Sequence, residues 1–370
     1  MEAQILPGAY QTNQYFPLIK GKKIGLVINQ GSRIQNQLLL DSLVHAGFQI
    51  GKIFVPEHGL RGNNDAGESI ENQIDSPTGI PIISLYGKHI SPDSTDLSGL
   101  DLIIFDLQDV GVRFYTYLST LHYVLKACIH FQKPFIILDR PNPNIEWIDG
   151  PILEPNYKSF IGLDPVPILY GMTIGEYGQM LLGENWIEEN QKTKIQIIRI
   201  KNYTHHSFYS IPIPPSPNLP NDQAIYLYPS LCLFEGTQIS IGRGTPFPFQ
   251  VFGSPDLMDQ PFSFTPMSII GKSKHPPYEN KTCYGVDLRN YPIEIGGKHG
   301  LGLKLDWIRK SFQAYQGKSP FFNSYFNKLS GEGFLAKDIQ EGKSDLEIRR
   351  KWKKGLEHFK SIRKKYLLYP

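Results

Sequence analysis

Several common sequence signals are missing from this chain, and each absence excludes a class of protein. It has only three cysteines, Cys128, Cys232 and Cys283, and none share a CxxC spacing, so thiolate metal binding is not expected. No stretch of about 18 apolar residues occurs, so a membrane span is not expected either. The formal net charge of +3 over 370 residues gives no general argument for nucleic-acid binding.

Nucleotide and hydrolase fingerprints are also absent. The letters after the first apolar stretch are "NQGSRI", which hold one glycine instead of the G-x-G-x-x-G that brings backbone close to a pyrophosphate. Neither GxxxxGK[ST] nor GxSxG occurs. The adjacent pair His205 and His206 would diverge, so we interpret both as surface residues. We therefore expect no cofactor and no metal.

The first twelve residues, "MEAQILPGAYQT", do not form a signal peptide, because they lack a basic start and an apolar centre. Two interpretations remain open at this point. The protein is cytoplasmic, or the sequence is an exported form from which a leader has been removed.

The first half of the chain alternates between apolar strand patterns and helix patterns. This alternation predicts an α/β fold with a doubly wound, mostly parallel sheet. The predicted strands are 22–29, 50–56, 80–87, 100–109 and 133–141, and the predicted helices are 36–47 and 116–131.

The second half is less regular. It predicts a helix over 172–187 with Thr173 as N-cap and a strand over 193–200. Five prolines within 211–222 indicate an extended connection and a domain boundary, which gives domains 1–210 and 211–370. The second domain is expected to be smaller and α+β. It ends in an amphipathic helix whose apolar residues recur at helical spacing: Trp352, Leu356, Phe359 and Ile362.

Polar side chains follow four of the predicted strands at the point where each strand ends. Ligands of open parallel sheets bind outside the carboxyl ends of the strands, so these residues are candidates for one site. They are Asn29 and Gln30, Glu57 and His58, then Asp106, Gln108, Asp109 and Arg113, and finally Asp139, Arg140 and Asn142.

A cleft with several carboxylates and no evident nucleophilic Ser or Cys favours glycoside hydrolysis, in which one carboxyl protonates the leaving oxygen and a second group assists. Glu57, in "PEHG", is the predicted acid. Asp65 and Glu68 lie in the glycine-rich segment that follows it. Glu68 is the favoured second group and Asp109 the next, and a route assisted by the substrate's own acetamide stays open.

The motifs "VPEHGLRG", "DAGE", "FDLQDVGVRFYTY", "LDRPNP", "PSPNLP" and "LFEGTQISIGRGTPFPF" resemble the bacterial exo-β-N-acetylmuramidase family, glycoside hydrolase family 171. The resemblance runs from about Lys22 to the C-terminus. It implies a Rossmann-like larger domain, a smaller C-terminal domain and an active site between them. It also implies a peptidoglycan-derived substrate, exo-acting release of N-acetylmuramic acid, a catalytic glutamate at Glu57 and an exported protein.

The lactyl carboxylate of N-acetylmuramic acid calls for a cation, and arginine matches carboxylate geometry. The candidates are Arg61, Arg113, Arg140 and Arg243. Arg243 is the first choice, because glycines flank it and leave room for a ligand, and an interdomain ion pair is the other interpretation of this residue. The alternative function is a non-catalytic receptor for muramyl glycans, which would use a similar two-domain cleft. The residues predicted to contact substrate are His58, Arg61, Asp65, Asp106, Gln108, Arg113, Tyr115, Asp139, Asn142 and Arg243.

Overall fold

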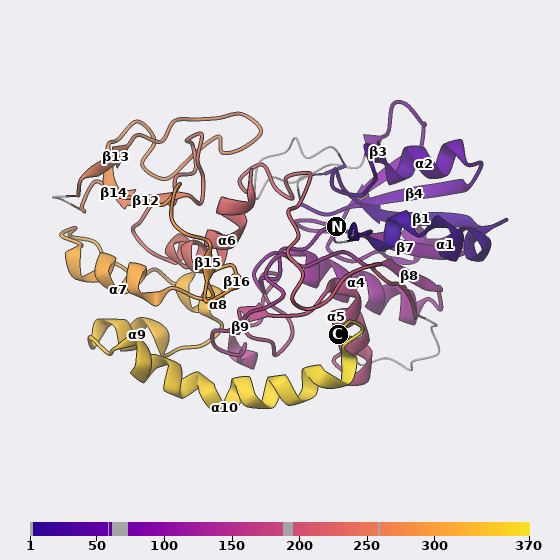
Figure 1. Ribbon diagram of the computed structural model, residues 1–370. Coiled ribbons are helices and arrows are strands. Elements are labelled where there is room, and N and C mark those ends of the chain that lie inside the picture. The colour runs from indigo at the N-terminus through magenta and orange to yellow at the C-terminus, as the bar shows by residue number, and fades with distance from the viewer. Residues whose placement is uncertain (1–2, 58, 61–72, 188–194, 258–259) are drawn as a thin grey trace.

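The computed structural model describes residues 3–57, 59–60, 73–187, 195–257 and 260–370. Figure 1 shows a first lobe built on a large sheet and a second lobe of shorter elements beside it. A long C-terminal helix, α10 (Asp345–Arg363), runs along both lobes and brings the end of the chain back to the first.

The large sheet has seven strands in the order β11-β8-β7-β1-β4-β6-β5. All of its neighbours are parallel except β5, which pairs antiparallel with β6 at one edge. This confirms the predicted doubly wound, mostly parallel sheet. The strands are β1 (Lys23–Ile28), β4 (Gln49–Val55), β5 (Gln73–Ile74), β6 (Pro81–Ser84), β7 (Leu102–Asp106), β8 (Phe135–Leu138) and β11 (Ile195–Ile198).

Helices cover both faces of this sheet. Successive side chains of a strand point to opposite faces, so an apolar strand presents apolar residues on both faces, and each face needs a cover. In β1, Leu26 and Ile28 pack with α1 (Thr12–Ile19) and α2 (Leu39–His45). Val27 lies in the other cluster, with α4 (Tyr117–His130) and α5 (Ile174–Gly183). All residues of β1 after Lys23 are therefore buried, which explains the continuous apolar run of this strand in the sequence.

Two local predictions can be compared with these elements. Thr173 caps α5 as predicted, and Glu176 completes a capping box with it. The helix predicted over 36–47 begins later, at Leu39. The residues before it form a short hairpin, β2 (Arg33–Ile34) and β3 (Gln37–Leu38), because Gln35 takes a left-handed turn with φ of 54° and reverses the chain.

The second lobe follows the proline-rich connection. It contains a three-stranded antiparallel sheet, β12-β14-β13, and several helices. The elements are α6 (Asp222–Leu231), β12 (Val251–Ser254), β13 (Phe262–Phe264), β14 (Cys283–Asp287), α7 (Leu305–Ala314), α8 (Phe326–Ser330) and α9 (Leu335–Gln340). Two short antiparallel pairs lie outside these sheets: β9 (Ile148–Asp149) with β10 (Leu169–Tyr170), and β15 (Glu294–Ile295) with β16 (Lys298–His299).

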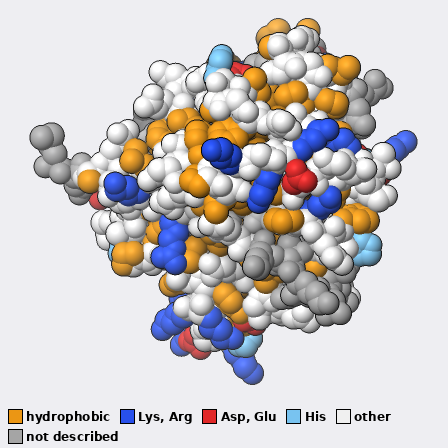
Figure 2. All heavy atoms as spheres, turned by 90° about the vertical axis from the view of Figure 1, so that its right-hand side faces the viewer, with side chains coloured by type: hydrophobic (Ala, Val, Ile, Leu, Met, Phe, Trp, Pro, Cys, Tyr) orange, Lys and Arg blue, Asp and Glu red, His pale blue; other side chains and the backbone are white. Residues whose placement is uncertain are grey.

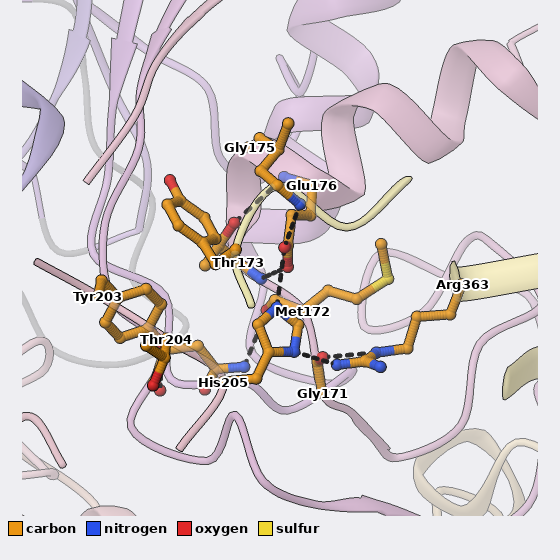
Figure 3. A network of polar contacts seen from close by, with 12 residues as sticks. Gly171, Met172, Thr173, Gly175, Glu176, Tyr203, Thr204, His205 and Arg363 are labelled. Carbon is orange, nitrogen blue, oxygen red and sulfur yellow. Dashed lines mark hydrogen bonds and ion pairs between the residues drawn. The ribbon is translucent and has the colours of Figure 1, made fainter. Parts of the chain in front are cut away.

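The end of the chain docks into a buried polar network of the first lobe. The Leu368 N–H donates to Glu176 at 2.8 Å, and the Tyr369 hydroxyl donates to Asp139. Figure 3 shows His205 between Glu176 and Arg363 in this network. The interpretation of His205 as a surface residue was therefore wrong, because its ring is buried and hydrogen-bonded to Glu176; His206 is exposed.

One hydrophobic cluster joins the two lobes. It contains Phe105 and Ile137 from the large sheet together with Leu227, Phe234 and Trp352 from the second lobe. Of the predicted core residues of the last helix, Trp352 and Phe359 are buried, and Leu356 and Ile362 are half-buried. The lobes therefore share a core and do not merely touch.

The outer surface adds two observations. On the face shown in Figure 2, which is the right-hand side of Figure 1, basic side chains are dispersed among neutral and apolar ones. Within the described ranges, none of the helices combines the length and the apolar character that crossing a bilayer requires.

Candidate active site

Glu57 lies at the carboxyl end of β4, in the middle of the large sheet. Val55 and Pro56 are buried, and the turn that follows returns the Gly59 N–H to the Pro56 carbonyl at 3.2 Å. Gly59 has φ of +73°, a left-handed conformation that favours glycine. The hydrogen bond between Gly59 and Pro56 thus closes a turn at the sheet edge, where Glu57 is half-buried.

Two hydroxyl groups reach the Glu57 carboxyl from neighbouring elements. Thr116, the N-cap of α4, places its Oγ1 3.4 Å from Glu57 Oε2. Tyr86, which follows β6, is hydrogen-bonded to the same carboxyl. Burial raises the pKa of the Tyr86 phenol, and the nearby Glu57 charge raises it further. The phenol is therefore a persistent donor at neutral pH.

The second lobe presents an ion pair toward the same region. Arg243 Nε donates to Glu235 Oε1 at 2.6 Å, and its guanidinium lies 5.1 Å from the Phe249 ring centroid. The positive charge of Arg243 lowers the pKa of Tyr86 slightly, so the ion pair lies within electrostatic range of this phenol. Charged groups from both lobes thus act in the region of Glu57.

A pocket of about 430 Å³ opens beside this ion pair. Its wall includes Tyr325, whose ring is 38% exposed, the largest exposure among the aromatic side chains at this pocket. Burial of its hydroxyl end raises the phenol's pKa, and the charges of Glu235 and Glu57 act in the same direction. The residues that line the pocket are Phe234, Glu235, Thr237, Gln238, Ile239, Ile241, Arg243, Pro277, Tyr278 and Tyr325.

Other predicted contacts at the sheet edge have their side chains engaged within the protein. Asp106 is fully buried and paired with Arg140, whose Nη2 donates to Asp106 Oδ2 at 2.8 Å. Gln108 Nε2 donates to the carbonyls of Asp109 and Pro141. This buried arrangement holds strand ends together.

Asp139 and Asn142 follow the same pattern. Asp139 accepts hydrogen bonds from Thr173, from the Gly175 N–H and from Tyr369, so it anchors α5 and the chain end. Asn142 is buried and donates to the Met172 carbonyl at 2.9 Å.

Arg113 is placed in the core and not at the pocket beside Arg243. Its guanidinium is 2% exposed and donates to four backbone carbonyls, two of them in the second lobe. The structure thus assigns Arg113 to joining the lobes, and with its terminal nitrogens used in this way it has no free edge for a substrate carboxylate. The four acceptors are the carbonyls of Pro151, Val166, Leu329 and Ser330.

Tyr115, one of the predicted substrate contacts, is only 8% exposed, and its hydroxyl donates to the Pro215 carbonyl at 2.8 Å. Asp109 is also buried, and it accepts hydrogen bonds from the Tyr170 hydroxyl and the Gly111 N–H. Burial raises the pKa of Asp109 to about 6, although both of these hydrogen bonds oppose the shift.

Four predicted residues, His58, Arg61, Asp65 and Glu68, lie outside the described residues. Sequence reasoning missed four others that the structure brings to the region of Glu57: Tyr86, Thr116, Glu235 and Tyr325. A signal for Tyr86 was present, since it lies near the end of the predicted strand over 80–87, and Glu57 likewise comes at the end of its own strand. The rule that ligands bind outside the carboxyl ends of the strands selected only charged and amide residues, so it did not select a phenol.

A potential metal-ligand group lies apart from the described site residues. Within the described ranges, atoms of His89, Asp93 and Asp96 lie within 4.8 Å of one another. Asp93 and Asp96 already form the capping box of α3 (Ser94–Leu97), and His89 Nε2 is 2.6 Å from Asp96. The three side chains therefore have protein partners.

The fold and the site together define a class. The protein is a two-lobed α/β protein with a half-buried carboxyl, hydroxyl donors and an arginine where its lobes meet. These groups are the ones that a carboxylate-dependent enzyme acting on glycans uses.

Comparison with known proteins gives the family. The family model for the N-terminal part of exo-β-N-acetylmuramidase NamZ matches residues 24–223, and the model for the C-terminal part matches residues 226–369. The chain belongs to the exo-β-N-acetylmuramidase NamZ family, which confirms the resemblance seen in its motifs.

Individual relatives agree with this assignment. The peptidoglycan β-N-acetylmuramidase NamZ of Bacillus subtilis (strain 168) is 36% identical over 380 residues, covering 96% of this chain and 89% of the relative. A crystal structure of a DUF1343 family protein from Bacteroides fragilis NCTC 9343 is 45% identical, with a TM-score of 0.91 and 99% of each chain covered. A second such protein from the same organism is 26% identical, with a TM-score of 0.82 and the same coverage.

Proposed function

We propose that this protein is an exo-acting glycoside hydrolase that releases terminal β-linked N-acetylmuramic acid from peptidoglycan fragments, with Glu57 as the general acid. Family membership supports the reaction and the substrate class. The observation that carries the residue assignment is the position of Glu57 at the end of β4, with hydroxyl groups beside it and a cation from the other lobe nearby.

In this mechanism Glu57 gives its proton to the glycosidic oxygen while the bond from that oxygen to the anomeric carbon breaks. The leaving sugar departs as a neutral alcohol, and water supplies the hydroxyl that ends on the anomeric carbon. The proton that this water loses passes to a carboxylate and restores the protonated form of Glu57, directly or through the second group. Glu68 is the proposed second group, with the substrate's acetamide as the other route. Asp109 is a weaker candidate, because its carboxylate is buried and already bonded to Tyr170 and Gly111.

Arg243 is the proposed partner of the lactyl carboxylate. Glu235 engages its Nε, and the terminal nitrogens of its guanidinium make no hydrogen bond to any other described residue. A guanidinium held by one edge can offer the other edge to a ligand carboxylate. The absence of a lactyl group from N-acetylglucosamine would then explain a preference for N-acetylmuramic acid.

Replacing Glu57 with Gln tests this function. The amide keeps the shape of the side chain but cannot donate an acidic proton. We expect turnover of an N-acetylmuramyl-N-acetylglucosamine disaccharide to fall about 100- to 10,000-fold, the range of general acid catalysis. Released sugar is measured by chromatography, and binding is measured by calorimetry with the same disaccharide.

Glu341→Gln, at an exposed position on the second lobe, serves as the matched control and should keep wild-type turnover. If Glu57→Gln retained more than about a tenth of the wild-type turnover, Glu57 would not be the acid, since such a loss is far below the general-acid range. If the wild-type protein bound the disaccharide and released no sugar, the non-catalytic receptor would be the correct function.

A further inference from the structure

We propose that Tyr86 is a positioning residue for Glu57, which holds the carboxyl in line with the leaving oxygen and stabilises the carboxylate formed when the proton departs. This inference rests on the proposed role of Glu57 and adds a residue that no motif indicated. It follows from strand register, ring packing and the hydrogen bond between the two side chains.

The ends of two neighbouring strands bring Tyr86 near Glu57. Strands β4 and β6 are parallel neighbours in which Val55 pairs with Ser84, and the Leu85 N–H donates to the Val55 carbonyl at 2.8 Å. Glu57 and Tyr86 each lie two residues beyond this last pair, where both strands have ended. Because parallel strands remain about 4.8 Å apart, a long phenol on one strand end can reach a carboxyl on the next.

The Tyr86 ring is fixed by packing and is not free to swing away. It makes an edge contact with Phe160, with ring centroids 5.8 Å apart, and Phe160 stacks in turn on Tyr123 at 6.2 Å. Because the ring is already held in this way, little further side-chain entropy is lost when its hydroxyl bonds the carboxyl. Tyr86 remains half-buried, so it borders the accessible side of Glu57.

The chemistry assigns a direction to this hydrogen bond. Once Glu57 has transferred its proton to the glycosidic oxygen, it is an anion, and a phenol O–H that points at it donates a charge-assisted hydrogen bond. The phenol itself keeps its proton, because burial and the Glu57 charge both disfavour a phenolate. Tyr86 therefore contributes more as the negative charge on Glu57 develops, which is the condition for lowering a barrier.

The test is Tyr86→Phe, which keeps the ring on Phe160 and removes only the hydroxyl. With the disaccharide, whose leaving sugar needs a proton, we expect kcat to fall about 10-fold, as for loss of one charge-assisted hydrogen bond, with KM changed by less than about 3-fold. With 4-nitrophenyl N-acetylmuramide, whose leaving group departs without a proton, the loss should be below about 3-fold.

Tyr123→Phe is the matched control, because it alters the same aromatic stack without touching Glu57. It should leave both substrates within about 2-fold of the wild-type kcat, as expected for a substitution away from the reacting groups. Equal losses of Tyr86→Phe on both substrates, or a Tyr86→Phe enzyme that matches Tyr123→Phe, would overturn the inference.

These measurements distinguish a failure of the role proposed for Tyr86 from a failure of the function proposed for Glu57. If Glu57→Gln abolishes turnover and Tyr86→Phe behaves like the control, only the role of Tyr86 fails. If Glu57→Gln stays active, the function of Glu57 fails first. Thermal unfolding of each variant verifies that the compared enzymes are folded.

Discussion

Arg243, the proposed partner of the substrate carboxylate, is held in place by contacts within the protein. Its Nε is bonded to Glu235 and its face lies over Phe249, so the orientation of the guanidinium is set before any substrate arrives. An exposed arginine without such contacts would lose side-chain entropy on binding, and this loss would weaken selection. The pocket beside it is therefore suited to one carboxylate at a fixed position.

Removing this cation gives a prediction about specificity. We expect Arg243→Ala to lower kcat/KM for N-acetylmuramyl substrates about 10- to 100-fold, the loss of a hydrogen bond to a charged group. The matching N-acetylglucosaminide should be affected far less, since it has no lactyl carboxylate. Comparing chromogenic glycosides of both sugars measures the ratio directly.

Arg289 provides the control, because it too lies over an aromatic ring, Phe247, and pairs with an acid, Asp287, but on an exposed surface. Arg289→Ala should leave the ratio of the two substrates unchanged. Equal losses on both sugars in Arg243→Ala would show that Arg243 acts on the fold or on a shared part of the substrate.

At the scale of single residues, the sequence could propose Glu57 and Arg243 as site residues but could not separate them from Asp139 and Arg113. All four are charged residues near predicted strand ends or glycines. What distinguishes Asp139 is the chain end, which arrives from more than 200 residues away and covers it. Such a partner is invisible to any argument from local spacing.

Helix α10 and the residues after it form the element that covers this network. The serine cap at Ser344, the apolar face of Trp352 and Phe359 and the basic last turn agree with the amphipathic pattern of the sequence. The pattern did not indicate where the helix would dock. That follows from the Tyr369 hydroxyl, which bonds Asp139 and accepts the Ile200 N–H at 3.0 Å.

Removing one hydroxyl from this element should destabilise the protein measurably. Tyr369→Phe leaves the buried Ile200 N–H without its acceptor and removes one of the donors to Asp139, so we expect the free energy of unfolding to fall by about 2–3 kcal/mol. Urea unfolding followed by circular dichroism gives this value.

Tyr366→Phe is a close comparison, since its hydroxyl bonds the less buried Glu184 at 2.7 Å. Here the change should stay within about 1 kcal/mol. If both variants lost the same amount, the buried network would contribute no more than a surface contact.

The whole molecule behaves as one structural unit in two lobes. A single hydrophobic cluster runs from Phe105 of the large sheet to Phe234 and Trp352 of the second lobe. Arg113 adds hydrogen bonds from the first lobe to the Leu329 and Ser330 carbonyls of the second. The predicted division into 1–210 and 211–370 stays a prediction about sequence organisation, and it does not describe two separate cores.

This shared core predicts that the halves cannot be separated. A fragment of residues 1–223 lacks the second lobe's part of the cluster as well as Leu368 and Tyr369, so we expect it to show no cooperative thermal transition. The full chain should unfold in one transition in a calorimeter. A sharp transition of the isolated fragment would contradict this expectation.

The return of the chain end to the first lobe also has a consequence for inheritance. A second lobe that completes the core of the first cannot be exchanged for another module without leaving Asp139 and Glu176 uncovered. Gene rearrangements that separate the two halves would produce unfolded products and be lost. The two parts recognised by separate family models are therefore expected to occur together, and in this order, wherever the fold is found.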